Sequence, residues 1–408
     1  MLKNNRPPGE IRERLGLERN VVVMSLSVFV VGAGEELWVR FIPKYLEALG
    51  ASPAWIGLFG TADDFLDAVY QYPGGYFSDR FGSGRSLVLF GSVAVLGYAI
   101  YALSWTWWPV FVGLIFVSAW SSMGSPAIFA LIADRLPSNR RAMGFTVQSL
   151  LKRIPIMISP AVGGLLIAHL GLFRGLRAAL VVTMILASAA LLAQRRLYSA
   201  SSVQLPHSPL NVSAQFRYMH SSLKRLLLSD VFVRTCEGMT GVFIVLYAIN
   251  IARVSPAQFG LLVTVQMGTS IAAYFPGAWL AGRYGRKPLV IATFICFAAF
   301  PLAIVVSPHG FNQLCPAFFL GGLREIGEPA RKALIVDLSD PERRGRTVGL
   351  YYLLRSLSIT PAAAIGGLLW KLDPSVPFFT ASAIGLLGTT IFAAMVDADE
   401  PKASQQAV

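Results

Sequence analysis

Apolar residues occur along the chain in long uninterrupted blocks, separated by short segments that carry most of the charge. No Asp, Glu, Lys or Arg occurs from Ser86 to Ala133, from Ala178 to Gln194, or from Pro288 to Leu323. Since about 20 apolar residues are enough for a helix to cross a bilayer, these blocks predict membrane-spanning helices and an all-α fold. Hydropathy predicts twelve such segments, at 20-46, 54-77, 86-105, 108-133, 142-168, 178-194, 230-252, 257-281, 288-306, 312-336, 345-370 and 376-396.

A single shift of 203 positions superposes separate pieces of the two halves of the chain, which predicts an internal repeat. Pro73-Gly74 falls on Pro276-Gly277, and Gly163-Gly164 falls on Gly366-Gly367. Six segments in each half give the two repeats the same orientation. The repeats are therefore expected to be parallel and related by an axis along the membrane normal.

The longest connection between apolar segments, 195-229, divides the chain into an N-terminal six-helix half, 1-194, and a C-terminal six-helix half, 230-408. This connection is the expected cytoplasmic linker. Its end, 216-228, mixes basic and apolar residues, so we expect an amphipathic helix lying along the membrane surface there.

The composition agrees with a membrane protein, because 54% of the 408 residues are hydrophobic and 14% are charged, whereas soluble proteins have about 25% charged residues. The net charge of +13 does not indicate nucleic-acid binding, because the basic residues lie in short loops. One set of alternating loops holds 22 of the 35 Lys and Arg residues, and short cytoplasmic loops are enriched in these residues. We therefore expect a multi-pass protein of the cytoplasmic (inner) membrane with both termini in the cytoplasm.

The loop after the second segment reads Gly75-Tyr76-Phe77-Ser78-Asp79-Arg80-Phe81-Gly82-Ser83-Gly84-Arg85. It resembles the Gly-x-x-x-Asp-Arg-x-Gly-Arg-Arg signature of the major facilitator superfamily, with Ser83 and Gly84 where the family has basic residues. The second copy has Gly282 in place of the acid. The resemblance implies twelve helices in two six-helix repeats, and a role for these loops in holding the cytoplasmic side closed. The residues of this implied cytoplasmic gate are Gly75, Asp79, Arg80, Gly82, Asp134, Arg283, Gly285 and Asp337.

The fifth segment contains a second motif, from Pro155 to Gly164. Its end resembles the Gly-x-x-x-Gly-Pro-x-x-Gly-Gly signature of antiporters in the same superfamily, with Pro155 and Ser159 in place of the first two glycines. Proline kinks a helix and small residues permit close helix contact, which suits a bundle that rocks. The same residues suit ordinary packing, so the motif favours export only slightly.

Sixteen ionisable residues lie at predicted membrane depth, where a charge is costly and usually faces a cavity or a partner. They fall in segments that the resemblance places around a central cavity. Three acids on one helix cannot all ionise cheaply, so we expect a carboxylate to carry a proton. The proton-coupling candidates are Asp63, Asp64, Asp67, Glu35 and Glu36. The substrate-cavity candidates are Arg40, Lys152, Arg153, Glu237, Arg324, Glu325, Glu328, Arg331 and Arg355, and the same segments also hold Arg234 and Lys332.

Spacing predicts several contacts among these charges. Lys152 and Arg355 coincide under the shift of 203, so two cations would face one cavity with an anionic group between them, either a substrate or a carboxylate of the protein. Arg324, Glu328 and Arg331 are spaced for a ladder of ion pairs, as is Glu36 with Arg40. Mutual neutralisation without proton traffic is the alternative interpretation.

The sequence as a whole predicts a secondary active transporter that moves a small polar or charged organic solute by alternating access. Proton-coupled efflux is preferred over proton-coupled uptake, and no nucleotide-binding GxxxxGK[ST] loop is present. The expected partners are the solute, protons and the lipid bilayer, with no nucleic acid, metal or cofactor, and the expected state is a monomer. A non-transporting receptor or scaffold of the same fold is the alternative. An enzyme is not expected, because no nucleophile and base lie at matched depth.

Overall fold

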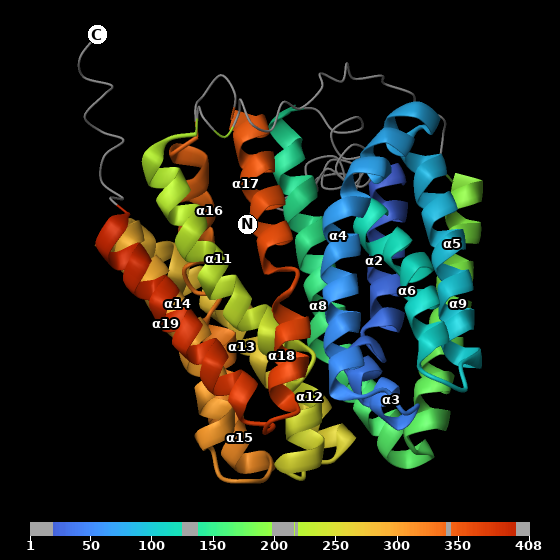
Figure 1. Cartoon of the computed structure of the whole chain (residues 1–408). Helices are drawn as coiled ribbons and strands as arrows, with labels where there is room; N and C mark the ends of the chain where they lie inside the picture. The colour runs from blue at the N-terminus through green and yellow to red at the C-terminus, as the bar shows by residue number, and fades with distance from the viewer. Residues whose placement is uncertain (1–18, 125–137, 198–215, 217–218, 340–343, 397–408) are drawn as a thin grey trace, which may run out of the picture. The chain divides into compact units, whose positions relative to one another are not determined.

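The computed structural model describes residues 19–124, 138–197, 216, 219–339 and 344–396. These residues are nearly all helical and contain no β-strand, as the apolar blocks predict (Figure 1). The elements that precede the long connection are α2 (Arg19–Glu35), the 3-10 helix η1 (Val39–Phe41), α3 (Ile42–Ala48), α4 (Pro53–Phe81), α5 (Ser83–Leu103), α6 (Trp108–Ser118), the π-helix η2 (Ala119–Met123), α8 (Ser138–Leu170) and α9 (Leu172–Leu197).

The elements that follow the connection come next. They are α11 (Ser221–Gly241), α12 (Ile244–Leu246), the π-helix η3 (Tyr247–Ile251), α13 (Pro256–Tyr284), α14 (Arg286–Val306), α15 (Phe311–Leu323), α16 (Glu328–Asp337), α17 (Arg344–Ile359), α18 (Ala362–Trp370) and α19 (Val376–Met395). Eleven of the twelve predicted segments coincide with one helix or with a helix that is interrupted along its length, and the described part of the segment 108-133 lies on α6 and η2.

Six helices in the described part of the chain are long and apolar enough to cross a membrane, and the bent pair Ser221–Gly241 and Ile244–Ile251 makes a seventh if it counts as one span. Charged residues explain why some of the other helices do not qualify as apolar spans. The 29-residue helix α4, for example, carries Asp63, Asp64 and Asp67 in its middle. The full set of twelve spans stays a prediction.

The internal repeat is visible in the bounds of the helices. The helices α4 and α13 both have 29 residues, and α5 and α14 both have 21, with starts 203 positions apart. A glycine with positive φ separates α4 from α5 and α13 from α14, with φ of 84° at Gly82 and 87° at Gly285. Glycine adopts this conformation at no steric cost. The two halves therefore turn from one helix to the next in the same way at this point.

Contacts divide the chain into two units, Met1–Leu49 with Leu66–His207, and Gly50–Phe65 with Ser208–Val408. The start of α4 belongs to the second unit through contacts with α18. The amide of Ala364, in the first turn of α18, donates a hydrogen bond to the Oγ1 atom of Thr61 over 3.0 Å. A side chain at Gly57 would collide with the backbone of Ala363 and Gly367. The predicted boundaries at 194 and 230 are not tested by these contacts.

The helix α11 begins at Ser221, nine residues before the predicted start of its segment. Its first turns do not form a separate surface helix, so that expectation was wrong. Leu223 and Leu226 are fully buried in a hydrophobic core that also contains Phe294, Leu334 and Phe392. In the second unit α11 lies beside α14 and α19 (Figure 1). Apolar packing at this end therefore continues the span rather than leaving it at the surface.

Candidate functional site

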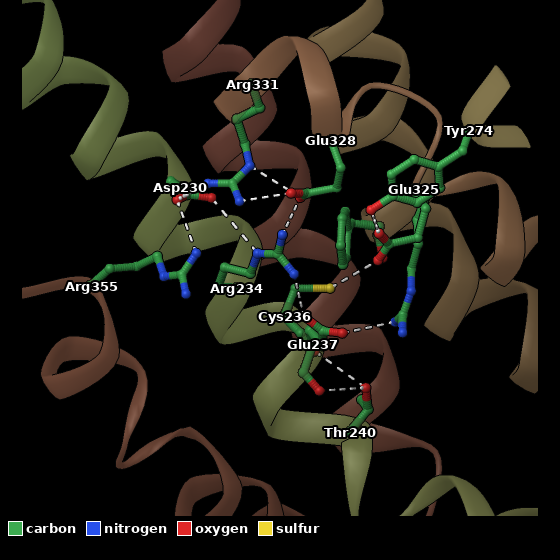
Figure 2. Close-up of polar contacts among 12 residues, drawn as sticks. Asp230, Arg234, Cys236, Glu237, Thr240, Tyr274, Glu325, Glu328, Arg331 and Arg355 are labelled. Carbon is green, nitrogen blue, oxygen red and sulfur yellow. Dashed lines mark hydrogen bonds and ion pairs between the residues drawn. The ribbon is translucent and has the colours of Figure 1, made fainter. Parts of the chain in front are cut away.

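Charged side chains gather in the second unit around α11, α16 and α17 (Figure 2). Four arginines and three carboxylates form one connected set of ion pairs among the described residues, which we call the arginine cluster. Its members are Asp230, Arg234, Glu237, Arg324, Glu328, Arg331 and Arg355. Burying this many charges in a predicted membrane span is costly unless they are paired and hydrogen-bonded.

Asp230 lies at the centre of the arginine cluster and is fully buried. Its Oδ2 atom accepts a hydrogen bond from Nη1 of Arg331 over 2.6 Å and another from the hydroxyl of Tyr351 over 2.9 Å. Nε of Arg234 lies 3.8 Å from the Oδ1 atom. Asp230 therefore joins α11 to α16 and α17 through its carboxylate.

Glu328 and Arg331 form a second buried pair, on the first turn of α16. Arg331 donates from Nε to Oε1 over 3.0 Å and from Nη2 to Oε2 over 2.8 Å, the bidentate geometry that strengthens an arginine–carboxylate pair. Arg234 also donates to Glu328 from α11. A carboxylate at this position is favoured as well by the positive end of the helix dipole.

Glu237 and Arg324 form the more accessible end of the arginine cluster. Arg324 lies 3.1 Å from Glu237, which also accepts a hydrogen bond from Arg234 over 2.8 Å. The side chain of Glu237 is 32% exposed, against 3% for Glu328. The carboxylate of Glu237 is therefore more accessible than the carboxylate of Glu328.

A break between α15 and α16 determines which carboxylate Arg324 contacts. The chain leaves the helix after Leu323, and the amide of Gly327 donates to the hydroxyl of Thr293 on α14 over 2.7 Å. This bond satisfies one of the backbone groups that the break frees. Because the helix does not continue through 324–327, Arg324 pairs with Glu237 on another helix. The predicted step from Glu328 to Arg331 is present.

Glu325 also lies in this break, outside the arginine cluster. Its Oε2 atom accepts a hydrogen bond of 3.4 Å from the hydroxyl of Tyr274 on α13 (Figure 2).

In the first unit, two neighbouring carboxylates lie where α2 ends and the chain turns into η1. Glu35 accepts a short hydrogen bond of 2.6 Å from the hydroxyl of Tyr98 on α5. The predicted pair of Glu36 and Arg40 is present, with Nε and the carboxylate 3.5 Å apart. A broken helix with a carboxylate at the break therefore occurs in this unit too.

The other predicted polar residues lie on α4 and α8. The side chains of Asp63 and Asp67 are exposed, and Asp64 is half-buried, on one continuous helix. Arg153 is half-buried on α8. Lys152 precedes it on the same helix, and its side chain lies outside the described residues. The structure therefore leaves the predicted pairing of Lys152 with Arg355 across a cavity as a prediction.

The residues of the predicted cytoplasmic gate lie at the end of α4, at the end of α13 and at the end of α16. Arg80 donates to the hydroxyl of Tyr76 over 3.1 Å, and Arg283 lies over the rings of Trp279 and Tyr284. Asp337 pairs with Arg286, the residue after Gly285. Gly75 lies within α4, as does Asp79, whose side chain is not among the described residues, and Asp134 lies outside them altogether.

Several residues of these sites were missed by sequence reasoning. Asp230 falls at the predicted edge of its segment, although its spacing of four from Arg234 was a signal for an ion pair on one helix face. Arg286, the partner of Asp337, belongs to the second copy of the loop motif. Tyr98 and Tyr351 carry no local signal, because the tertiary fold alone brings each hydroxyl to a carboxylate.

Chemically, the arginine cluster can bind anions, exchange salt-bridge partners and take up protons on its carboxylates. Within residues 19–124, 138–197, 219–339 and 344–396, no group of three or more His, Cys, Asp or Glu side chains is arranged to hold a metal ion.

Known proteins resemble this chain over almost its whole length. It is 22% identical over 388 residues to an uncharacterized MFS-type transporter of Methanocaldococcus jannaschii, covering 91% of this chain and 93% of that protein. It is 23% identical over 363 residues to the multidrug resistance protein MdtH of Proteus mirabilis, covering 84% and 86% of the two chains. It is 19% identical over 381 residues to the quinolone resistance protein NorA of Staphylococcus aureus, covering 92% and 96%.

Solved structures and family models give the same answer. The nucleoside transporter NupG superposes with a TM-score of 0.78 at 11% identity, covering 93% of this chain and 100% of that one, which shows the shared fold. The relatives are transporters, so the expectation of a protein that is not an enzyme is confirmed. The model of the Major Facilitator Superfamily matches residues 24–233 and again 226–408. The chain therefore belongs to the major facilitator superfamily and is an integral membrane transporter.

Proposed function

We propose that this transporter exports a small polar or charged organic solute in exchange for protons, as a monomer in the cytoplasmic membrane. The direction is supported by relatives that are named as multidrug and quinolone resistance proteins. The antiporter-like motif from Pro155 to Gly164 also favours export. In this proposal the two six-helix repeats, 1-194 and 230-408, alternate access around a central site.

The observation that carries the proton coupling is the position of Glu35. Its carboxylate lies at the break between α2 and η1, where it accepts a 2.6 Å hydrogen bond from Tyr98. An ionised carboxylate at membrane depth is costly, so gain and loss of a proton there changes the stability of the surrounding helices. Glu35 is therefore our first candidate for the proton carrier, and Glu36, which pairs with Arg40, follows it in the chain.

The three acids of α4, Asp63, Asp64 and Asp67, are the second set of candidates. Ionising all three is unfavourable, because like charges four residues apart on a helix repel each other. The negative charges of two of these carboxylates would then favour protonation of the third. This role and the role of Glu35 make different predictions for single substitutions.

The experiment is solute-driven proton flux in proteoliposomes that contain the purified chain and a pH-sensitive dye. A quinolone serves as the first probe, since one relative is named for resistance to it. We compare Glu35→Gln, Asp63→Asn and Asp67→Asn with wild type, and Glu47→Gln on α3 is the matched control. Loss of proton flux in Glu35→Gln alone supports the first candidate, and loss in the aspartate variants alone supports the second.

Undiminished proton flux in all three test variants would reject the carboxylate assignment. Proton movement in the same direction as the solute would show uptake by symport rather than export. Solute binding without any flux would show a receptor that retains the fold.

The cytoplasmic gate is part of the same proposal. The ion pair between Arg286 and Asp337 ties the start of α14 to the end of α16. In the first half the residue 203 positions before Arg286 is Ser83, so the two halves hold this end differently. We propose that Asp79 and Arg80 serve the first half, with Asp134, and that Arg283 and Asp337 serve the second.

A further inference from the structure

The arginine cluster has one more positive than negative group. Its four guanidinium groups face three carboxylates within the described part of the chain. Glu325, the nearby acid, bonds to Tyr274. A surplus cation in a buried, low-dielectric environment is unfavourable unless another anion joins it.

Three of the four arginines have a carboxylate partner at close range. Arg331 makes three hydrogen bonds of 2.6 to 3.0 Å to Asp230 and Glu328. Arg234 donates to Glu328 and Glu237, and Arg324 lies 3.1 Å from Glu237. The surplus positive charge therefore does not belong to these three residues.

Arg355 on α17 has no such partner among the residues that the structure describes. Its closest carboxylate atom is Oδ2 of Asp230, 3.7 Å from Nη1, which is beyond hydrogen-bond distance. Its Nε atom is buried and makes no hydrogen bond. The guanidinium carbon lies 4.8 Å from the ring centre of Tyr352, and the side chain is 18% exposed. Arg355 is thus a mostly buried cation that a small anion can still reach.

Asp230 is not free to turn toward Arg355. The atom nearest to Arg355, Oδ2, already accepts from Arg331 at 2.6 Å and from Tyr351 at 2.9 Å. The other oxygen, Oδ1, faces Arg234. Moving the carboxylate would break two good hydrogen bonds to make one, so the protein's own acid does not complete the coordination of Arg355.

We propose that Arg355 binds the carboxylate or phosphate group of the transported solute, which makes the solute an organic anion or a zwitterion. The inference rests on the proposed transport function and names the chemical class of its solute. Arginine suits this task because its planar fork of donors matches the two oxygens of such a group. A lipid phosphate offers the same chemistry, and the experiment distinguishes the two sources.

The test measures the melting temperature of the purified full-length chain in a neutral detergent. The probes are sodium benzoate, its neutral counterpart benzamide, and dioleoyl phosphatidylglycerol, with sodium chloride used to match ionic strength. We expect benzoate at about ten times its Kd to raise the melting temperature by about 1–2 °C, and benzamide to leave it unchanged. If phosphatidylglycerol alone stabilises the chain through Arg355, the anion is a lipid and the proposal is wrong.

The variants are Arg355→Gln and Arg355→Lys, with Lys371→Gln as an exposed control. We expect Arg355→Gln to melt near the wild-type temperature without ligand, because the guanidinium makes no hydrogen bond to the residues that the structure describes. We also expect it to lose the benzoate response. Arg355→Lys should keep part of the response, since the charge remains and the fork does not, and Lys371→Gln should keep all of it.

Three results would overturn the proposal: an unchanged benzoate response in Arg355→Gln, an equal response to benzamide, or no wild-type response to benzoate, succinate and phenyl phosphate. A Gln variant that does not fold also counts against it, because Arg355 would then serve Asp230. Anion binding without flux in proteoliposomes rejects the transport function and leaves this site intact. Flux that is indifferent to Arg355 and to solute charge rejects this site and leaves transport intact.

Discussion

Asp230 is fully buried and accepts hydrogen bonds from both Arg331 and Tyr351. Breaking a buried ion pair leaves an uncompensated charge, which typically costs about 3–5 kcal/mol. We expect Asp230→Asn to lower the free energy of unfolding by an amount in this range. Thermal unfolding of purified protein measures the effect.

The matched control for this prediction is Asp337→Asn. Asp337 also pairs with an arginine, Arg286, but both side chains are about 40% exposed. Exposed pairs contribute about 0–1 kcal/mol because water screens them. Equal losses in the two variants would contradict the special role of the buried position.

The hydroxyl of Tyr98 gives a second prediction at the scale of single residues. Hydrogen bonds to charged groups are worth about 1.5–3 kcal/mol, so Tyr98→Phe should reduce stability measurably and should impair solute-driven proton flux through Glu35. Tyr284→Phe, at an exposed position on α13, keeps the same ring change without a carboxylate partner. If Tyr98→Phe and this control show equal proton flux, the hydrogen bond from Tyr98 to Glu35 has no role in proton coupling.

Ion pairs between residues three or four positions apart, Glu36 with Arg40 and Glu328 with Arg331, could be predicted from the sequence, but pairs between distant segments could not. Hydropathy placed Glu237, Arg324, Glu328 and Arg331 in apolar segments, and the structure has Glu237 on α11, Arg324 in the turn after α15, and Glu328 and Arg331 on α16. The partner of Arg324 depends on the break at 324–327, which turns its side chain toward α11 instead of along its own helix. Asp230 was missed because apolar residues thin out around it, although Leu226 and Leu227 continue the buried face.

At the scale of helices, glycines at equivalent positions of the two halves permit the same close contacts. A side chain at Gly163 would collide with the carbonyl of Leu37, where α2 has ended. One at Gly366 would collide with the carbonyl of Met239, near the end of α11. The antiporter-like motif thus has a packing role in the first half that its counterpart shares, which explains the glycines without reference to the direction of transport.

This contact gives a prediction at the scale of the helix pair α11 and α18. Gly366→Ala should destabilise the chain by about 1–3 kcal/mol, because the added methyl group has no room beside the Met239 carbonyl. In contrast, Gly349→Ala on α17 meets open space, and alanine favours a helix over glycine by about 1 kcal/mol. Melting temperatures of the two variants should therefore differ in sign relative to wild type.

The helices themselves were largely predictable, because each predicted segment in one half has a counterpart 203 positions away in the other. The shift of 203 matches the starts of α4 with α13 and of α5 with α14, and Ser104 and Ser307 each donate to a carbonyl four residues back over 2.6 Å. The breaks were not predictable, since the fourth segment of the first half contains a π-helix at Ala119–Met123 where the second half has an open turn at 324–327. Such local differences depend on side-chain and backbone partners from other helices, such as Thr293.

For the molecule as a whole, the two repeats share a fold but not a charge distribution. The positions of Asp230, Arg234 and Glu237 correspond to Ser27, Val31 and Gly34 in the first half. The arginine cluster is therefore a property of the second repeat, and Glu35 with Tyr98 is a property of the first, where the equivalents would be Gly238 and Pro301. Separate polar sites in the two halves suit a division of labour in which one half carries the proton and the other holds the solute.

The orientation of the whole chain gives the last prediction. The turn at Gly285, between α13 and α14, is flanked by Arg283, Arg286 and Lys287 and is expected in the cytoplasm. Lys371, after α18, belongs to the sparsely basic opposite side. In a background with Cys236, Cys296 and Cys315 replaced by serine, Lys371→Cys should react with a membrane-impermeant maleimide on intact cells. The variant Gly282→Cys, at an exposed glycine with open space around it, should react only after the cells are permeabilised. The reverse pattern would place both termini outside the cell and would contradict the predicted orientation.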